Sequence, residues 1–258
     1  MIRLLRRLGY ALALPVLLLV VWWITTDDSE NFYLPPLRTI LRAFAETWTL
    51  ERFQADVLPS LARFAAGYAL AGVVGVTVGL LIGGLRWLRA LLEPVLEFFR
   101  AIPPPVLVPV IMLFAGIDHT MKVVVIAVGA VWPILLNTVE GVRSVDEVLV
   151  DTCRAYQLRR FARLRHVILP AASPQIVTGL RQALSIGIIL MVISEMFASS
   201  NGLGYTIIEF QRSFAIPEMW SGILLLGLIG FALSVLCRAV ENRVLAWYHG
   251  LRRAQRSS

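Results

Sequence analysis

Few side chains in this sequence have the type and spacing that catalysis or metal binding requires. The three histidines are His119, His166 and His249. They are scattered and offer no metal-ligand spacing. Ser185 lies in a stretch, residues 183–187, that is one residue short of G-x-S-x-G, and no apolar stretch supplies a histidine base. The only lysine, Lys122, is not part of a G-x-x-x-x-G-K-[ST] phosphate loop. We therefore predict no catalytic residue, no metal and no cofactor bound by this chain.

The composition shows which solvent surrounds the elements that carry these residues. The 258 residues are 58% hydrophobic and 16% charged, with a mean hydropathy of +0.75. Soluble domains are roughly 45–50% apolar and about 25% charged. The excess predicts an all-α integral membrane protein and excludes a soluble enzyme, a disordered regulator and a disulfide scaffold. We attribute the net charge of +7 to the positive-inside bias of membrane proteins and not to nucleic acid.

Six stretches are long and apolar enough to span a bilayer, which needs about 20 residues. They cover approximately residues 8–26, 64–85, 101–117, 123–139, 177–198 and 220–237. The first follows three arginines, as in a signal peptide. However, its apolar run is long for one, and no small-x-small cleavage site follows Ile24. We therefore predict that it is retained as a membrane span.

The distribution of charge predicts the orientation. An even number of spans places both termini on one side, and that side carries eighteen of the 24 basic residues. Basic residues concentrate on the cytoplasmic side. We therefore predict a multi-pass protein of the cell inner membrane with cytoplasmic N- and C-termini.

Two segments outside the spans have helical patterns. Residues 37–48 carry apolar residues at helical spacing, which predicts an amphipathic helix on the outer membrane surface. The cytoplasmic segment 140–173 contains Ser144 three residues before Glu147, the pattern of a capping box that begins a helix. A second, basic helix should follow and end at Pro170, with Ser173 and Pro174 beginning the fifth span.

The cytoplasmic segment carries a resemblance to a known family. The letters DTCRAYQ at 151–157, with V at 167 and LP at 169–170, match the spacing of the EAA loop, E-A-A-x3-G-x9-I-x-L-P. Further blocks agree in order: RAIP at 100–103, RSVD at 143–146, AASPQIVTGLR at 171–181 and EMFASSNGLGY at 195–205. Over residues 60–245 the chain resembles permeases of binding-protein-dependent ABC importers. It looks like the subgroup that imports nitrate, sulfonates, taurine and related small compounds.

The signature itself departs from the family pattern. Asp151 replaces the family Glu, Thr152 and Cys153 replace two Ala, and Gln157 replaces the Gly. That Gly lies at a bend, where left-handed dihedrals cost a non-Gly residue about 1 kcal/mol. Either the bend is less sharp here or the strain is tolerated.

The resemblance implies a type I importer permease of about six transmembrane helices with a cytoplasmic coupling-helix loop. It would import a small solute as a homodimer, although heterodimers occur in the family, with two ATP-binding subunits and an extracytoplasmic binding protein. ATP and Mg would be bound by the partner subunits. The predicted ATPase-coupling residues are Leu149, Asp151, Thr152, Cys153, Ala155, Tyr156, Gln157 and Leu158.

Within the membrane, three features suggest packing or transport roles. Gly75, Gly79 and Gly83 are four residues apart and predict close helix packing, within the chain or in a dimer. Prolines are expected to interrupt the third and fourth spans, and broken helices line cavities. Glu195 is an intramembrane acid, with a gating or pairing role. The candidates for the translocation path are Pro103, Pro109, Pro133 and Glu195.

The main alternative is an ion-coupled secondary transporter or a channel, which needs buried charges for coupling or selectivity. Residues 101–139 carry only the loop-proximal Asp118 and Lys122, and no inverted repeat is detectable. We therefore favour the partner-driven permease. Its predicted organisation is a first span and surface helix (1–59), a permease core (60–245) that contains the coupling loop (140–173), and a basic cytoplasmic tail (246–258).

Overall fold

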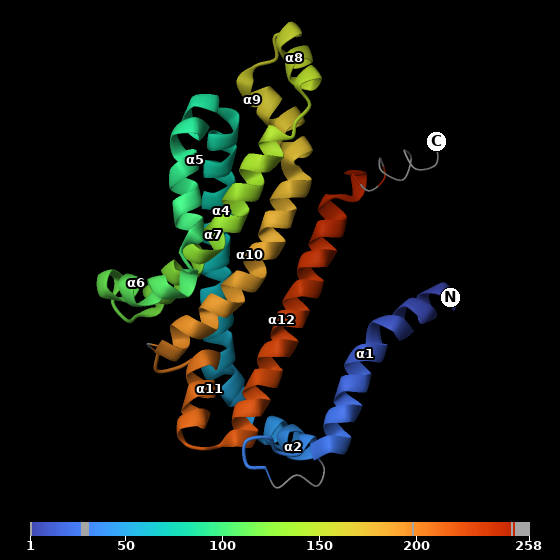
Figure 1. Ribbon diagram of the computed structural model, residues 1–258, viewed down its shortest axis with the longest axis vertical. Coiled ribbons are helices and arrows are strands. Elements are labelled where there is room, and N and C mark those ends of the chain that lie inside the picture. The colour runs from blue at the N-terminus through green and yellow to red at the C-terminus, as the bar shows by residue number, and fades with distance from the viewer. Residues whose placement is uncertain (1, 27–30, 198, 249, 251–258) are drawn as a thin grey trace.

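The computed structural model is built from helices (Figure 1). It describes residues 2–26, 31–197, 199–248 and 250, without the side chains of 2–12 and 15. The α-helices are α1 (Ile2–Thr26), α2 (Leu37–Thr47), α3 (Leu50–Arg52), α4 (Leu58–Gly84), α5 (Arg86–Ala101), α6 (Leu107–Ala115), α7 (His119–Arg143), α8 (Glu147–Ala155), α9 (Arg160–Arg163), α10 (Leu169–Phe197), α11 (Leu203–Arg212) and α12 (Ile216–Val244). Three short helices of other types join them: η1 (Phe53–Val57), η2 (Pro104–Val106) and η3 (Leu164–Ile168).

Four continuous helices within the described residues are long and apolar enough to cross a bilayer. They are Leu50–Gly84, His119–Arg143, Arg160–Phe197 and Ile216–Val244. These four cover the predicted second, fourth, fifth and sixth spans to within one residue at their ends, and residue 198, at the end of the fifth, lies outside the described residues. The predicted first span lies within α1, whose 25 residues form one helix.

The predicted third span, 101–117, is wrong as a single helix. Only Ala101 of this stretch belongs to α5, and most of the rest forms the short helical segment Pro104–Ala115, which meets Arg86–Ala101 at an angle of 80°. Ile102 and Pro103 both have extended backbone, with ψ of 120°. Proline lacks a donor and disfavours helical dihedrals in the residue before it, so the run Pro103-Pro104-Pro105 ends one helix and begins another. The pair counts as a fifth span only if both halves are taken together.

Pro133 does not interrupt the fourth span as predicted. Helix α7 is continuous from His119 to Arg143 and contains Pro133 in its interior. The carbonyl of Pro133 accepts a hydrogen bond from Asn137 Nδ2 at 2.8 Å. Partly buried packing against neighbouring helices supports such a proline in a membrane helix.

A stripe of small residues holds α4 against α7. A Cβ atom at Gly67, Gly75, Gly79 or Gly83 would lie 2.6 to 2.8 Å from side-chain carbons of α7. Only residues without a side chain allow this approach. The prediction that Gly75, Gly79 and Gly83 allow close helix packing is confirmed within the chain, Gly67 extends the stripe, and α10 covers the other side of α7 (Figure 1).

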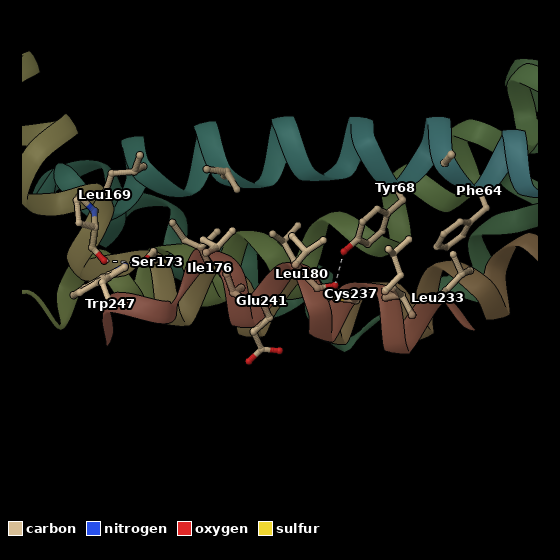
Figure 2. A pocket seen from close by; sticks show the side chains of 18 of the residues that line it. Phe64, Tyr68, Leu169, Ser173, Ile176, Leu180, Leu233, Cys237, Glu241 and Trp247 are labelled. Carbon is tan, nitrogen blue, oxygen red and sulfur yellow. Dashed lines mark hydrogen bonds between the residues drawn. The ribbon is translucent and has the colours of Figure 1, made fainter. Parts of the chain in front are cut away.

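Helices α1 and α12 lie outside this three-helix core. Trp22 of α1 and Trp220 of α12 form an edge-to-face pair with ring centroids 5.5 Å apart. An apolar groove of about 920 Å³ separates much of α12 from α4 and α10 (Figure 2). Tyr68, on the α4 side of this groove, donates its hydroxyl proton to the carbonyl of Leu180 at 2.8 Å.

Helix α2 confirms the predicted amphipathic helix. Its Leu37, Ile40 and Ala43 are buried, whereas Leu41 is exposed. The helix packs against α12, and Trp48 Nε1 donates to Ser221 Oγ at 3.1 Å. It lies at the end of the bundle that also carries α11, opposite α8 (Figure 1).

The helix boundaries in segment 140–173 differ from those predicted. Asp146, not Ser144, caps α8, because its carboxylate accepts a hydrogen bond from Val148 N at 2.8 Å. Ser144 instead ends α7. The second helix does not end at Pro170: it runs on from Arg160 to Phe197, with Pro170 and Pro174 inside.

The close contact of α4 with α7 predicts the effect of adding a side chain. Replacement of Gly79 by Val should destabilise the fold by about 1–3 kcal/mol, because the new carbons overlap Thr138. Gly227→Val in α12 is the matched control, since a Cβ there has no neighbour within 4 Å. Fluorescence-detected gel filtration after heating in detergent measures both variants. Equal loss of monodisperse protein would contradict the packing.

Candidate functional site

The first candidate site is the hairpin of α8 and α9, which projects from one end of the bundle (Figure 1). Its predicted coupling residues include three exposed apolar or aromatic side chains: Leu149, Tyr156 and Leu158 are 49%, 79% and 47% exposed. Asp151 is also exposed and pairs with Arg154 at 2.8 Å. Apolar side chains at the tip of a projecting element are suited to contact another protein.

The remaining predicted coupling residues shape the hairpin. Thr152 Oγ1 donates to the carbonyl of Val148 at 2.7 Å, within α8. Cys153 is buried, and Ala155 is the last residue of α8 and is exposed. Of the predicted set, therefore, Cys153 alone is turned inward.

Gln157 adopts the bend expected of the family glycine. Its φ is +53°. Its N–H donates to the carbonyl of Arg154, and that of Leu158 donates to Cys153, both at 2.9 Å. This pair of bonds is a Schellman motif, in which the left-handed residue follows the helix cap. The bend is therefore as sharp as the family pattern requires, and the chain tolerates the strain.

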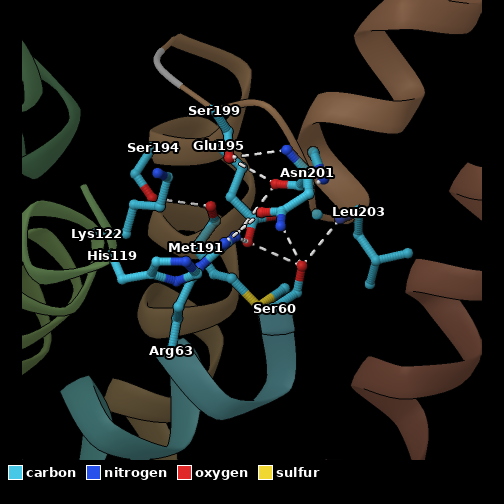
Figure 3. Close-up of polar contacts among 12 residues, drawn as sticks. Ser60, Arg63, His119, Lys122, Met191, Ser194, Glu195, Ser199, Asn201 and Leu203 are labelled. Atoms are coloured by element: carbon cyan, nitrogen blue, oxygen red, sulfur yellow. Dashed lines mark hydrogen bonds and ion pairs between the residues drawn. The ribbon is translucent and has the colours of Figure 1, made fainter. Parts of the chain in front are cut away.

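The second candidate site is a buried polar cluster at the opposite end, around Glu195 (Figure 3). Glu195 is fully buried in α10 and pairs with Arg63 of α4, which is 3% exposed, at 2.7 Å. Ser60 Oγ donates to the carboxylate at 2.8 Å, and Gly204 N donates at 3.0 Å. The geometry therefore supports the pairing role considered for Glu195.

The same cluster caps the start of α11. Gly202 N donates to Asp56 Oδ1 at 3.1 Å, and Leu203 N donates to Ser60 Oγ at 2.9 Å. With Gly204 bound to Glu195, three backbone donors at this helix start have side-chain acceptors. Gly202 has a φ of +117°, and a Cβ there would lie 2.6 Å from the carboxyl carbon of Glu195. The glycine turn inferred from the sequence is therefore required by the carboxylate.

Two further side chains orient Arg63. Its Nε donates to His119 Nδ1 at 2.9 Å, and its terminal nitrogens donate to the carbonyl and the side-chain oxygen of Asn201. The sequence does not reveal this cluster, because Arg63 directly precedes the predicted second span and therefore resembles the basic residues outside the membrane. A buried acid in one span requires a cation in another, so the intramembrane Glu195 was the signal that a buried cation should lie near it.

The predicted path residues do not form one site. Pro103 lies at the bend between α5 and α6, and Pro109 is exposed on α6. Pro133 lies in the middle of α7, where its carbonyl closely approaches Gly179 of α10. Glu195 belongs to the polar cluster. No group of three or more His, Cys, Asp or Glu residues in the described part of the chain could hold a metal ion.

This helical bundle with a projecting hairpin has counterparts among solved structures. Among solved structures, a chain of the MetNI methionine ABC transporter in an inward-facing conformation is similar to this chain. The TM-score is 0.63 at 20% identity, over 78% of this chain and 98% of that one.

This chain belongs to the family described as binding-protein-dependent transport system inner membrane component, which it matches over residues 75–246. It is 29% identical to a putative aliphatic sulfonates transport permease of Bacillus subtilis, over 94% of this chain and 89% of that protein. It is also 29% identical to the taurine transport permease of Escherichia coli, over 94% and 91%. A bicarbonate transport permease of Synechococcus elongatus is 32% identical over 74% and 66%.

Family membership identifies the chain as a multi-pass permease subunit of an ABC importer, as the resemblance implied. The alternative of an ion-coupled carrier or a channel is not supported. Relatives of the same family carry names for sulfonate, taurine and bicarbonate transport, and these agree with the predicted subgroup.

The buried ion pair predicts strong energetic coupling. Either Arg63→Met or Glu195→Gln alone should destabilise the protein by about 3–5 kcal/mol, because each leaves a buried charge without its partner. The double variant should lose less than the sum. Thermal stability in detergent gives the three values, and strict additivity would contradict the pairing. The exposed pair Arg100–Glu97 is the control, since Arg100→Met there should change stability little.

The strained bend predicts a stabilising substitution. Gln157→Gly should remove about 1 kcal/mol of left-handed strain, whereas Gln157→Val should add strain. Hydrogen exchange of the Gln157 and Leu158 amides should slow about fivefold in the glycine variant, since 1.4 kcal/mol corresponds to a factor of ten. Faster exchange in Gln157→Gly than in the original chain would show that the bend is not strained.

Proposed function

We propose that this permease works as a homodimer with two ATP-binding subunits and an extracytoplasmic binding protein. In this arrangement the α8 hairpin is cytoplasmic and both termini lie on that side. The basic character of the hairpin supports this orientation, since Arg154, Arg159, Arg160, Arg163 and Arg165 lie in or beside it. ATP and Mg are bound by the partner subunits, and this chain supplies the pathway.

The observation that carries the proposal is the exposed surface of the hairpin. Leu149, Tyr156 and Leu158 present apolar area at its tip, and Asp151 and Arg154 lie beside them as an exposed ion pair. Buried aromatic anchors supply binding energy in protein interfaces, and charges beside them fix orientation. We assign these residues to the contact with the ATP-binding subunit, with Gln157 setting the angle of the hairpin.

A second surface supports the homodimer. Leu113 and Phe114 of α6 are 83% and 88% exposed. They lie in the predicted third span, which also contains the path candidates Pro103 and Pro109. Large apolar side chains this exposed require cover by lipid or by another chain. A second copy packed there would place Pro103 and Pro109 beside the path, and the solute would pass between the copies.

The proposed solute is a small molecule with an anionic group. The names of the similar permeases refer to sulfonates, taurine and bicarbonate, each of which carries such a group. The binding protein would select the solute, and the permease would pass it across the membrane.

Charge reversal on the hairpin tests the coupling contact. The double variant Asp151→Arg, Tyr156→Arg should lose the co-purifying ATP-binding subunit, because it removes an aromatic anchor and reverses a charge in the interface. Purification from native membranes in mild detergent, with ATP hydrolysis as the readout, measures this. Glu46→Arg, an exposed reversal on α2 at the opposite end, is the control and should retain the partner. If both variants keep the ATPase, the hairpin is not the contact.

A further inference from the structure

A pocket of about 540 Å³ lies beside the buried polar cluster, between the ends of α6 and α10 and the starts of α7 and α11. Arg63 and His119 of the cluster line it, together with Lys122 of α7, which also lies close to the cluster (Figure 3). Its volume suits a small molecule. The charge balance of its lining indicates which kind.

Lys122 is the unusual group in this pocket. It is 3% exposed, and its Nζ donates to the carbonyl of Ile117 at 3.2 Å. No carboxylate of the described residues lies within 4 Å of it. An ammonium group has three donors, and a buried charge without a counter-ion is costly. The remaining donors and the charge of Lys122 are therefore available to a ligand.

The other charges of the pocket leave its potential positive. The charge of Arg63 is balanced by Glu195. Asp118 is the acid that lines the pocket, and Arg212, exposed on α11, is a second cation that forms no ion pair with the residues that the structure describes. Lys122 and Arg212 together therefore exceed Asp118 by one positive charge.

The start of α7 adds to this potential. Asp118 occupies the N-cap position but makes no side-chain cap bond, so the first-turn N–H groups of a 25-residue helix keep their partial positive charge. His119 accepts from Arg63 through Nδ1, which leaves Nε2–H as a donor. Backbone and side-chain donors thus act with Lys122.

One part of the pocket wall is apolar. Met112 and Ile117 from the α6 end and Phe197 from the end of α10 line the pocket. A ligand that fits therefore has an anionic head for Lys122 and a short apolar body for this wall. A bare inorganic ion would leave the wall unused.

We propose that this pocket binds the anionic head of a small organic oxyanion, with Lys122 as its principal cation. The inference deepens the proposed import function and rests on it for the direction of transport. Lys122 receives the head at the α11 end, where the solute would arrive from the binding protein. Arg212 raises the local anion concentration at the pocket mouth.

A cysteine reporter tests the potential of the pocket without transport. Ser200, an exposed residue of the lining, is replaced by Cys in a chain that carries Cys153→Ser and Cys237→Ser. In full-length protein in membranes, the anionic reagent methanethiosulfonate ethylsulfonate should react faster than its trimethylammonium counterpart. The ratio of the two rates should fall about tenfold with Lys122→Gln and recover with Lys122→Arg. An unchanged ratio in Lys122→Gln overturns the proposal.

Protection tests the ligand itself. Ethanesulfonate should slow the reaction of the cationic reagent with the cysteine of Ser200→Cys, and Lys122→Gln should abolish this protection. Choline should protect the cysteine in neither the chain with Lys122 nor the Lys122→Gln variant. Absence of protection, or equal protection in both chains, overturns the assignment. If Lys122→Gln does not fold, Arg212→Gln at the exposed rim is used in its place. It should lower the rate ratio about threefold, and no change would overturn the positive potential.

Transport separates this inference from the proposed function. ATP-driven uptake of ethanesulfonate is measured in proteoliposomes that contain the permease, its ATP-binding subunit and the binding protein. Protection without uptake supports the pocket and contradicts the import function for this solute. Uptake without protection supports the import function and contradicts the pocket.

Discussion

The structure depends on one buried charge, the carboxylate of Glu195. In a membrane protein, a fully buried carboxylate is stable only if donors surround it, and here they come from two other helices, α4 and α11. Ser60 and Arg63 belong to α4, Glu195 lies near the end of α10, and Gly204 lies in the first turn of α11. The ion pair therefore fixes the relative positions of these helices, and the glycine turn at Gly202 follows because a side chain there would displace the carboxylate.

The rest of the bundle divides into a rigid core and exposed outer helices. Small residues bring α4 against α7, so backbone packing supplies the cohesion that the hydrophobic effect cannot supply between helices in lipid. Helices α1, α6 and α12 instead leave large apolar side chains exposed, among them Leu113, Phe114 and Phe231. Such a chain is complete only with lipid and further protein around it, as expected for one subunit of an importer.

The sequence predicted the parts of this fold that depend on local pattern. The positions of the second, fourth, fifth and sixth spans follow from apolar length, the glycine stripe from its spacing, and the bend at Gln157 from the family loop. It failed where tertiary packing decides: Pro133 and Pro170 lie inside continuous helices, and Asp146 rather than Ser144 caps α8. The Arg63–Glu195 pair joins residues 132 positions apart, so no local pattern reveals it.

The continuous helix Arg160–Phe197 connects the two candidate sites mechanically. Its 38 residues make a rod of about 57 Å, anchored near one end by the buried ion pair and continuous at the other with the coupling hairpin. If the anchored end acts as a pivot, a tilt of about 10° displaces the hairpin by about 10 Å, given that length. Hairpin motion is then converted to rotation about Glu195, beside the pocket that contains Lys122. The five-residue π-helical turn Leu164–Ile168 lies within this rod, close to the hairpin, and is where we expect the connection to bend.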